Sequence, residues 1–285
     1  MQTKIGVIGG SGLYEMEGLK VLEEKTVDTP FGKPSDAIVI GELNNQKIAF
    51  LPRHGRGHVI SPSEINFRAN IYALKLLGVE RIFSVSAVGS MKEEIAPGDM
   101  VIVDQFIDRT RSRPYTFFEK GIVAHVSFAD PVCPDLFNTA FAASKKVGAK
   151  THKGGTYVCI EGPMFSSRAE SKLFRSWGVD VIGMTNLQEA KLAREAEICY
   201  ATIALSTDYD CWHESEEAVD VAMVIAIIQK NVATAKEIIR EAIKNLPQSR
   251  NCLCCKALEN AIMTDKKKIT PEVKKRLEAV AGKYL

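Results

Sequence analysis

The sequence lacks a long apolar run and lacks an excess of charge of either sign. Its 285 residues include 37 Lys and Arg against 35 Asp and Glu, a formal net charge of +2. Such a balance provides no basic surface of the kind that attracts nucleic acid or anionic lipid. Met1 leads directly into strand-like residues without the pattern of a signal peptide, and no apolar segment has the length of a membrane span. We therefore expect a cytoplasmic protein with no nucleic acid and no membrane among its partners.

Several common catalytic motifs are also missing. The chain contains no G-x-S-x-G, no H-E-x-x-H and no Walker A lysine. The turn Gly9-Gly10-Ser11-Gly12 follows a predicted strand, but it lacks the G-x-G-x-x-G spacing of a dinucleotide-binding turn. This argues against a nicotinamide-dependent dehydrogenase. The turn instead offers backbone amides and a hydroxyl group to an anion.

The seven cysteines do not form a familiar metal-binding pattern. Four are scattered among apolar residues, and we interpret them as small buried side chains: Cys133, Cys159, Cys199 and Cys211. The other three form a tight cluster near the C-terminus, Cys252, Cys254 and Cys255. No matching Cys or His pair lies near that cluster in the sequence, so a zinc site is disfavoured and we expect no metal. Disulfide pairing of these three thiols stays an alternative.

The composition and the order of the predicted elements indicate an α/β protein. The chain is 46% hydrophobic and 25% charged and has no low-complexity linker and no repeat, which favours a single domain over 1–285 with a Cys-bearing segment and helix at about 247–285. Apolar patterning predicts strands at 5–8, 37–43, 46–51, 81–88, 101–104, 155–160, 179–183 and 198–206. It predicts helices at about 61–77, 135–147, 166–177, 187–196, 217–245 and 270–283. Strands separated by helices predict a mixed, largely parallel central sheet flanked by helices.

The segment that follows the last predicted strand is the most informative. Asp208 and Asp210 stand two residues apart, so an extended chain points both carboxyl groups to one side. A protonated carboxyl can donate to a ring nitrogen while a carboxylate oxygen accepts from an amine, and adenine presents that pattern at N7 and N6. An Asp pair that merely ends a strand is the simpler alternative.

Other polar groups are predicted at the ends of neighbouring strands, in the turns 9–13, 52–58, 86–90, 184–186 and 206–212. Because ligands collect at the carboxyl ends of parallel strands, we expect these turns to converge on one pocket. Arg53 offers a bidentate fork for phosphate oxygens and His54 offers one more donor. Ser86 and Thr185 offer hydroxyl groups, and Phe165 could either stack on a base or belong to the core.

These segments, in one order over roughly the first 225 residues, resemble the trimeric purine nucleoside phosphorylases. The matching stretches are 9–13, 52–55, 86–90, 161–170, 184–185 and 207–212. The resemblance implies a phosphate site formed by Ser11, Arg53, His54, the Ser86 hydroxyl, the Ala87 amide and Thr185. It places Met184 against the ribose and Phe165 against the base, with Asp208 and Asp210 on adenine. It also implies a 5′ pocket made by Val221, Val224 and, from a neighbouring subunit, His125.

The resemblance further implies an activity: phosphorolysis of 5′-methylthioadenosine to adenine and 5-methylthioribose 1-phosphate, in methionine and purine salvage. Asp208 would be the catalytic acid, inorganic phosphate a co-substrate, and no metal or organic cofactor would be needed. The assembly would be a homotrimer or a hexamer built as a dimer of trimers. In the 6-oxopurine enzymes of this family an Asn stands at the position of Asp208, so Asp here favours 6-aminopurines.

Three departures from the pattern of the family are present. Met164 stands where these enzymes usually carry Arg, Ser11 and Ser86 stand where many members have Thr and keep the hydroxyl group, and Asn186-Leu187-Gln188 replaces a more usual Thr-Val-Pro, which leaves the base preference open. The cysteine cluster resembles a disulfide-forming cluster of heat-adapted members but has one more adjacent thiol, so its pairing also stays open. The nearest alternative is a broad-specificity or 6-oxopurine nucleoside phosphorylase acting on inosine, guanosine or methylthioinosine. A non-catalytic protein that binds purine nucleosides is the alternative from another class.

Overall fold

The computed structural model of the chain describes residues 3–213 and 221–285, without the side chains of Ser11, Tyr14 and 221–225. Within these residues eleven strands form one sheet. They are β1 Ile5–Gly9, β2 Lys20–Lys25, β3 Ile38–Leu43, β4 Gln46–Pro52, β5 Arg81–Ser90, β6 Met100–Val103, β7 Gln105–Arg109, β8 Thr151–Lys153, β9 Thr156–Ile160, β10 Val181–Gly183 and β11 Cys199–Asp208. The main path runs β2-β3-β4-β1-β5-β10-β9-β7, and β11, β6 and β8 branch from β5.

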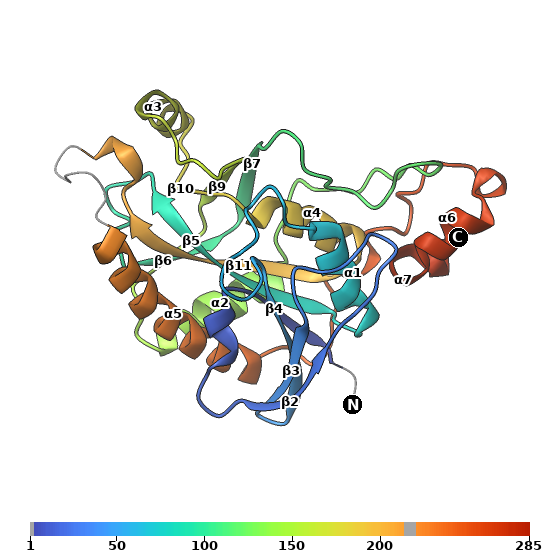
Figure 1. The fold of residues 1–285 in the computed structure, drawn as a ribbon, viewed down its shortest axis with the longest axis horizontal. Coiled ribbons are helices and arrows are strands. Elements are labelled where there is room, and N and C mark those ends of the chain that lie inside the picture. Colours follow the sequence, from blue (N-terminus) through green and yellow to red (C-terminus); the bar gives the residue numbers. More distant parts are fainter. Residues whose placement is uncertain (1–2, 214–220) are drawn as a thin grey trace.

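β5 is the centre of this sheet because three strands pair with it (Figure 1). β1 pairs with it in parallel as far as Ser84, and β11 pairs in parallel along nearly its whole length. β10 joins antiparallel only at Gly89 and Ser90. Among the described strands, none therefore pairs with residues 85–88 of β5 on the edge that β1 and β10 share. That interruption leaves a stretch of backbone open at the carboxyl ends of β1 and β11.

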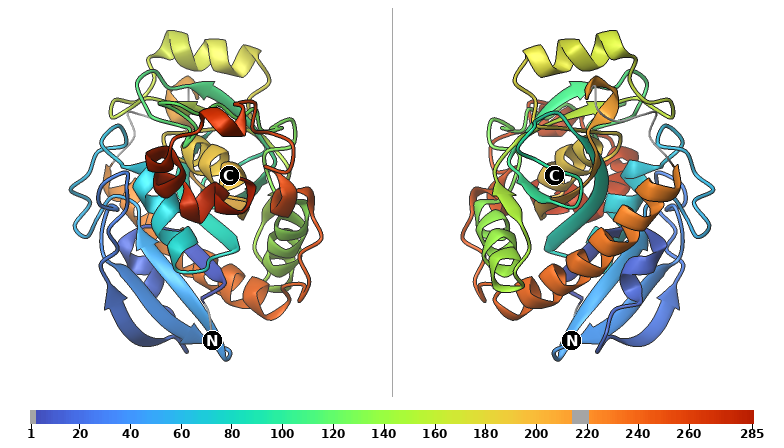
Figure 2. Two further views of the ribbon diagram at one scale, coloured as in Figure 1. Left: turned by 90° about the vertical axis from the view of Figure 1, so that its right-hand side faces the viewer. Right: turned by 90° about the vertical axis from the view of Figure 1, so that its left-hand side faces the viewer.

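Helices cover both faces of the sheet. They are α1 Phe67–Leu76, α2 Pro134–Lys146, α3 Arg168–Ser176, α4 Asn186–Glu195, α5 Val221–Lys244, α6 Pro271–Arg276 and α7 Glu278–Ala281. Ile82 packs with α1, α4 and the C-terminal helices, whereas the next residue, Phe83, packs with α2 and α5 on the opposite face (Figures 1 and 2). This alternation follows from the pleat of a strand buried on both sides. The predicted α/β class, a mixed and largely parallel sheet flanked by helices, is confirmed.

Some element boundaries differ from the predictions. The 86–90 segment is not a turn, because β5 continues through Ser90 while β11 and then β10 supply backbone partners. Helix α1 begins six residues after the predicted Ser61, because Asn66 caps it by accepting a hydrogen bond from the amide of Ala69. Ser61 and Glu64 instead bond each other in a turn. The last predicted helix is two short helices separated at Leu277.

The expectation that the C-terminal cysteines have no matching pair was wrong. The C-terminal cluster does have a matching pair, because the fold brings Cys133 and Cys199 against Cys252 and Cys254, with all four sulfur atoms within 4.8 Å of one another. The pair was not recognised because these residues are far apart in the chain. Among the described helices, none combines the length and apolar character that crossing a membrane requires.

Candidate functional site

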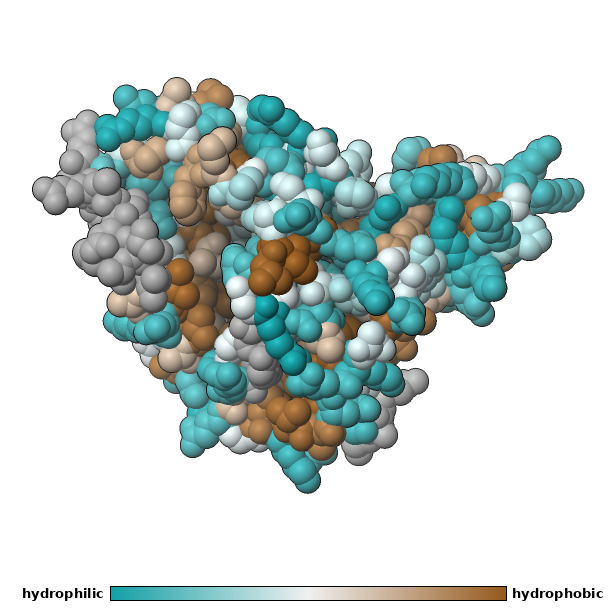
Figure 3. Space-filling model, viewed as in Figure 1, coloured by the Kyte–Doolittle hydropathy of each residue, from teal (hydrophilic) through white to brown (hydrophobic). Residues whose placement is uncertain are grey.

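A cavity of about 550 Å³ opens where β5 has its unpaired edge, a volume within the usual range for small-molecule sites. On the face seen in Figure 3 the surface is hollowed and apolar between α5 and the loops that follow the sheet. The walls come from the ends of β1, β4, β5, β10 and β11 and from one face of α5. The residues that line it are Gly10, Gly12, Leu13, Arg53, His54, Gly55, His58, Pro62, Val85, Ser86, Ala87, Val88, Gly89, Ile160, Phe165, Ser166, Ile182, Gly183, Met184, Thr185, Leu205, Thr207, Asp208, Asp210, Ile228 and Val232.

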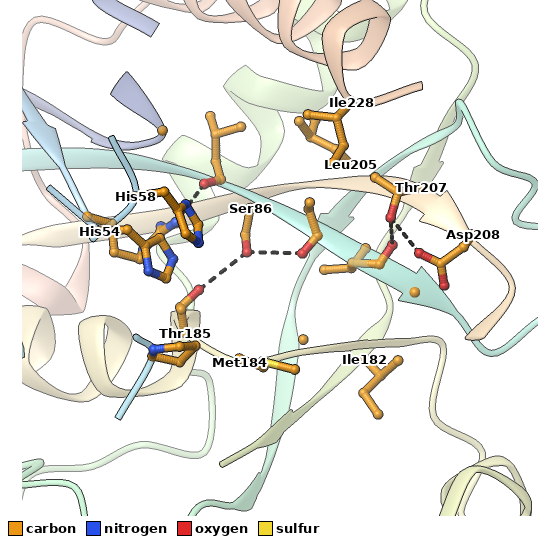
Figure 4. Close-up of a pocket in the computed structure, with 18 of the residues that line it drawn as sticks. His54, His58, Ser86, Ile182, Met184, Thr185, Leu205, Thr207, Asp208 and Ile228 are labelled. Atoms are coloured by element: carbon orange, nitrogen blue, oxygen red, sulfur yellow. Dashed lines mark hydrogen bonds between the residues drawn. The ribbon is translucent and has the colours of Figure 1, made fainter. Parts of the chain in front are cut away.

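Nine of the predicted site residues line this one cavity: Arg53, His54, Ser86, Ala87, Phe165, Met184, Thr185, Asp208 and Asp210. The predicted convergence of the five segments is therefore confirmed. Figure 4 shows His54, Ser86 and Thr185 at one end of the cavity and Asp208 at the other, with Met184 between them. The cavity thus has a hydroxyl-rich end, an apolar middle and a carboxylate end.

Four predicted residues are not placed in the cavity. The side chains of Ser11, Val221 and Val224 lie outside the described part of the structure, although Gly10 and Gly12 beside Ser11 line the cavity, as do Ile228 and Val232 further along α5. His125 is exposed, and its amide donates to the carbonyl of Ala261 in the C-terminal segment. The cavity of its own chain does not include it, and its predicted role in a neighbouring subunit stays a prediction.

The hydroxyl-rich end is built by β5 and the start of α4. The hydroxyl oxygens of Ser86 and Thr185 lie 3.3 Å apart, and both residues are buried. Thr185 directly precedes α4, a ten-residue helix whose N-terminal amides carry a partial positive charge. Ala87, on the unpaired edge of β5, is exposed to the cavity. Two hydroxyl groups, free backbone and a helix N-terminus are the donors that a phosphate group needs.

Arg53 lies beneath this end, and its geometry corrects one prediction. Its guanidinium fork faces Glu189 of α4 instead of the cavity, with Nε 2.5 Å from Oε1 and Nη2 3.3 Å from Oε2. Two of the three other N–H groups donate to the hydroxyl of Ser84 at 2.6 Å and to the carbonyl of Val85 at 3.0 Å. Burial opposes the charge, but the nearby carboxylate of Glu189 outweighs it and raises the pKa of Arg53. Arg53 therefore offers the cavity one N–H group, and its positive charge is largely compensated by Glu189.

His54 is neutral at physiological pH. Burial, together with the charge of Arg53, lowers its pKa to about 4. Its Nδ1 lies 2.8 Å from the carbonyl oxygen of Ile60, which can only accept, so Nδ1 carries the proton. Nε2 of the neutral ring is then an acceptor and not the additional donor that the sequence argument expected. The ring also stacks on His58, with centroids 4.2 Å apart.

At the other end Asp208 and Asp210 have different surroundings. Asp208 accepts two hydrogen bonds, from the amide of Asp210 at 2.8 Å and from the hydroxyl of Thr207 at 2.7 Å. Asp210 is half-buried, and burial raises its pKa, with the charge of Asp208 adding to the effect. Gly89 leaves the room for both, because a Cβ there would lie 3.0 Å from Oδ1 of Asp208. Burial thus favours the protonated form of Asp210.

The middle of the cavity combines apolar side chains of very different exposure. Phe165 is 85% exposed, so the alternative that it belongs to the core is wrong. It lies two residues before Ser167, whose capping box with Glu170 fixes the start of α3. Met184 lies against Gly162, where a Cβ would come within 2.5 Å of its sulfur atom. A side chain at 162 would therefore displace Met184 from the wall.

Several residues that position the site were not predicted. Arg113 is buried and its guanidinium donates to the carbonyls of Met184 and Glu161 and to Oε1 of Gln188 at 3.3 Å, which holds two walls of the cavity together. Glu189 accepts hydrogen bonds from Arg53 and so fixes the direction of its guanidinium group. Both lie away from the strand-end motifs, and an isolated charged residue in a loop or helix gives no signal of such a role in a single sequence.

The chain is similar in sequence to known phosphorylases. The sequence profile of the phosphorylase superfamily matches residues 4–244. The S-methyl-5'-thioadenosine phosphorylase of Geobacter sulfurreducens is 61% identical over the full length of both chains, and that of Koribacter versatilis is 56% identical over all of this chain and 97% of its own.

Solved structures extend the similarity to three dimensions. A methylthioadenosine phosphorylase from an antarctic soil metagenomic library superposes with a TM-score of 0.94 at 49% identity, over 98% of this chain and 99% of its own. The methylthioadenosine phosphorylase of Schistosoma mansoni in complex with adenine gives a TM-score of 0.81 at 38% identity, over 85% and 91% of the two chains. With a family profile over most of its length and relatives this similar from end to end, the chain belongs to the phosphorylase superfamily and, within it, to the family of the S-methyl-5'-thioadenosine phosphorylases.

Proposed function

We propose that this protein is an enzyme that catalyses phosphorolysis of 5′-methylthioadenosine, releasing adenine and 5-methylthioribose 1-phosphate. The observation that carries the proposal is the single cavity with a hydroxyl-rich end at Ser86 and Thr185 and a carboxylate end at Asp208 and Asp210. These ends suit a phosphate and an aminopurine, and the apolar middle with Met184 suits the sugar between them. The names of the similar proteins given above agree with this substrate.

The phosphate end would fix the nucleophile. Phosphate would accept hydrogen bonds from the hydroxyl groups of Ser11, Ser86 and Thr185. It would also accept from the amide of Ala87 and from the one N–H group of Arg53 that has no partner among the described residues. Because Nε2 of His54 is an acceptor, we assign it to the O–H group of monohydrogen phosphate. A phosphate oxygen held in this way is aligned to attack C1′ as the bond from C1′ to N9 breaks. Its negative charge also stabilises the cationic sugar that develops.

The carboxylate end would stabilise the leaving base. As the bond from C1′ breaks, the electron pair moves to the purine, and a proton on N7 neutralises the resulting charge. Asp208 is our candidate for the group that faces N7, with an oxygen accepting from N6. Burial, together with the charge of Asp208, raises the pKa of Asp210, so a proton is held more readily at this end of the cavity than on an exposed carboxyl group. No metal or organic cofactor takes part in these steps.

We also propose an assembly in which a neighbouring subunit completes the site. The 5′-methylthio group would lie beside α5, near Val221 and Val224, and would contact His125 of a neighbouring subunit in a homotrimer, or in a hexamer made from two trimers. We further propose that the enzyme acts in methionine and purine salvage in the cytoplasm. The molar mass in solution, from sedimentation equilibrium, tests the assembly directly: a monomer at working concentration excludes the role of His125.

The decisive experiment measures free base released from 5′-methylthioadenosine, adenosine and inosine, each with and without phosphate. We expect phosphate-dependent release of adenine from methylthioadenosine and little hypoxanthine from inosine. Dominant hypoxanthine release would replace the proposal by the 6-oxopurine alternative. Binding of all three nucleosides without release of any base would replace it by the non-catalytic alternative.

A further inference from the structure

Four cysteines meet at the end of the sheet opposite the cavity. Cys199 is the first residue of β11 and Asp208 the last, so the two ends of this strand lie about 30 Å apart. Cys133 directly precedes α2, and Cys252 and Cys254 belong to the segment that returns after α5. In Figure 2 this segment lies beside α2. Elements from three distant parts of the chain thus deliver one sulfur cluster.

The distances within the cluster suit a central ion. All four sulfur atoms lie within 4.8 Å of one another, and those of Cys199 and Cys252 lie 3.2 Å apart. Four thiolates at 2.3 Å around a tetrahedral Zn²⁺ lie about 3.8 Å from each other, inside this range. All four cysteines are free thiols, and a shared central ion would hold four sulfur atoms in mutual proximity of this kind.

The ligand chemistry selects zinc among the common metals. The cluster consists of sulfur donors alone, and a set of four thiolates is typical of structural zinc. Three of the four side chains are buried among apolar residues, while Cys252 is half-buried and provides a route of entry. Cys255 is excluded, because its sulfur atom points to the carbonyl oxygen of Cys252 at 3.0 Å.

We propose that Cys133, Cys199, Cys252 and Cys254 bind one structural Zn²⁺, which attaches the segment after α5 to the base of the sheet. Binding releases the four thiol protons and forms four Zn–S bonds, and no electron is transferred. With four protein ligands the coordination sphere is closed, so the ion takes no part in the chemistry of the distant cavity.

The test measures the metal content of the full-length protein purified with a reductant, by plasma mass spectrometry. We expect one zinc per subunit in the wild type and in Cys255→Ser, the matched control next to the cluster. Cys252→Ser and Cys254→Ser should lose at least about nine-tenths of it. Cobalt added to the metal-free wild type should produce the sulfur-to-cobalt charge-transfer absorption of a tetrahedral thiolate site, an assay that needs no variant to fold.

Three results would overturn the proposal. One is a metal-free wild type that gives no cobalt spectrum while its thiols are free to alkylation. Another is a protein whose four cysteines resist alkylation until a reductant is added, which would show two disulfides instead. The third is zinc bound equally by the wild type and by Cys254→Ser. None of these outcomes depends on the nucleoside activity.

Discussion

Replacing Asp208 by Asn tests the carboxylate end of the cavity with a change of few atoms. In the structure Oδ1 of Asp208 accepts from the amide of Asp210, and Oδ2 accepts from the hydroxyl of Thr207. An Asn oxygen can keep the first bond, which places the NH₂ group at the position of Oδ2. Thr207 can then turn its hydroxyl hydrogen to the carbonyl of Val88, 3.2 Å away. The orientation of the new amide is therefore determined, and we expect a loss of stability below about 1 kcal/mol.

The catalytic effect should be much larger and should depend on the base. The amide can donate a hydrogen bond to N7 of adenine but cannot transfer a proton, and general acid catalysis contributes about 10²–10⁴ in rate. We expect kcat/KM for adenosine to fall by about 100-fold or more. For inosine the NH₂ group gains a partner in O6, so its kcat/KM should change by less than about tenfold.

The assay is phosphate-dependent release of base from adenosine and inosine by the wild type and Asp208→Asn, with Asp28→Asn, at an exposed position outside the cavity, as the matched control. Thermal melting shows whether each variant is folded. Equal losses of kcat/KM on the two nucleosides would refute the reasoning. An effect that is the same for a 6-amino and a 6-oxo base cannot come from contacts at N6 and N7.

Three further predictions concern the surroundings of the cavity. Glu189→Gln leaves the buried guanidinium of Arg53 without its counter-charge, so the free energy of unfolding measured with urea should fall by about 3–5 kcal/mol; a loss below about 1 kcal/mol would mean that the pair is not needed for folding. His54 has a pKa of about 4 in the folded chain against about 6.5 unfolded, so its contribution to stability is complete above about pH 6.5 and is lost as the pH falls toward 4. His54→Gln should flatten this part of the pH profile, and an unchanged profile would assign the effect to other groups. Ser167→Ala removes the cap of α3 and should cost about 0.5–2 kcal/mol, seen as faster amide exchange in that helix, whereas Ser176→Ala at its end should leave exchange in the first turn unchanged.

The sequence was sufficient for the parts of the fold that depend on local pattern. The apolar runs of β1, β5 and β11 were predicted, and so were β3 and β4, which are joined by Asn44 and Asn45 with positive φ. It failed for β2, whose residues are all exposed and lack alternation, and for β7, an exposed or half-buried strand for which no strand was predicted. Such strands exist because a neighbouring strand offers backbone partners, which no local pattern records.

The site shows the same division. Motifs at strand ends identified nine residues of the cavity wall, because chemistry that needs Asp, His or Ser at a strand end leaves a local signal. The partner of Arg53 was not predicted, and so the direction of its guanidinium was wrong. Glu189 lies 136 residues away, and only the packing of α4 on the sheet brings the two together. The cysteine pair 133 and 199 was missed for the same reason.

The interruption in the pairing of β5 has a consequence for substrate size. Ser86 and Gly89 are three residues apart on one strand, so the two ends of the cavity are separated by a fixed length of about 10 Å. β11 pairs along this stretch, with one register shift between Ser206 and Asp208, and a paired strand shifts only by whole residues. β5 therefore fixes the distance between the phosphate end and the base end of the cavity. A larger or smaller nucleoside would have to be accommodated elsewhere, at the exposed Phe165 or along α5.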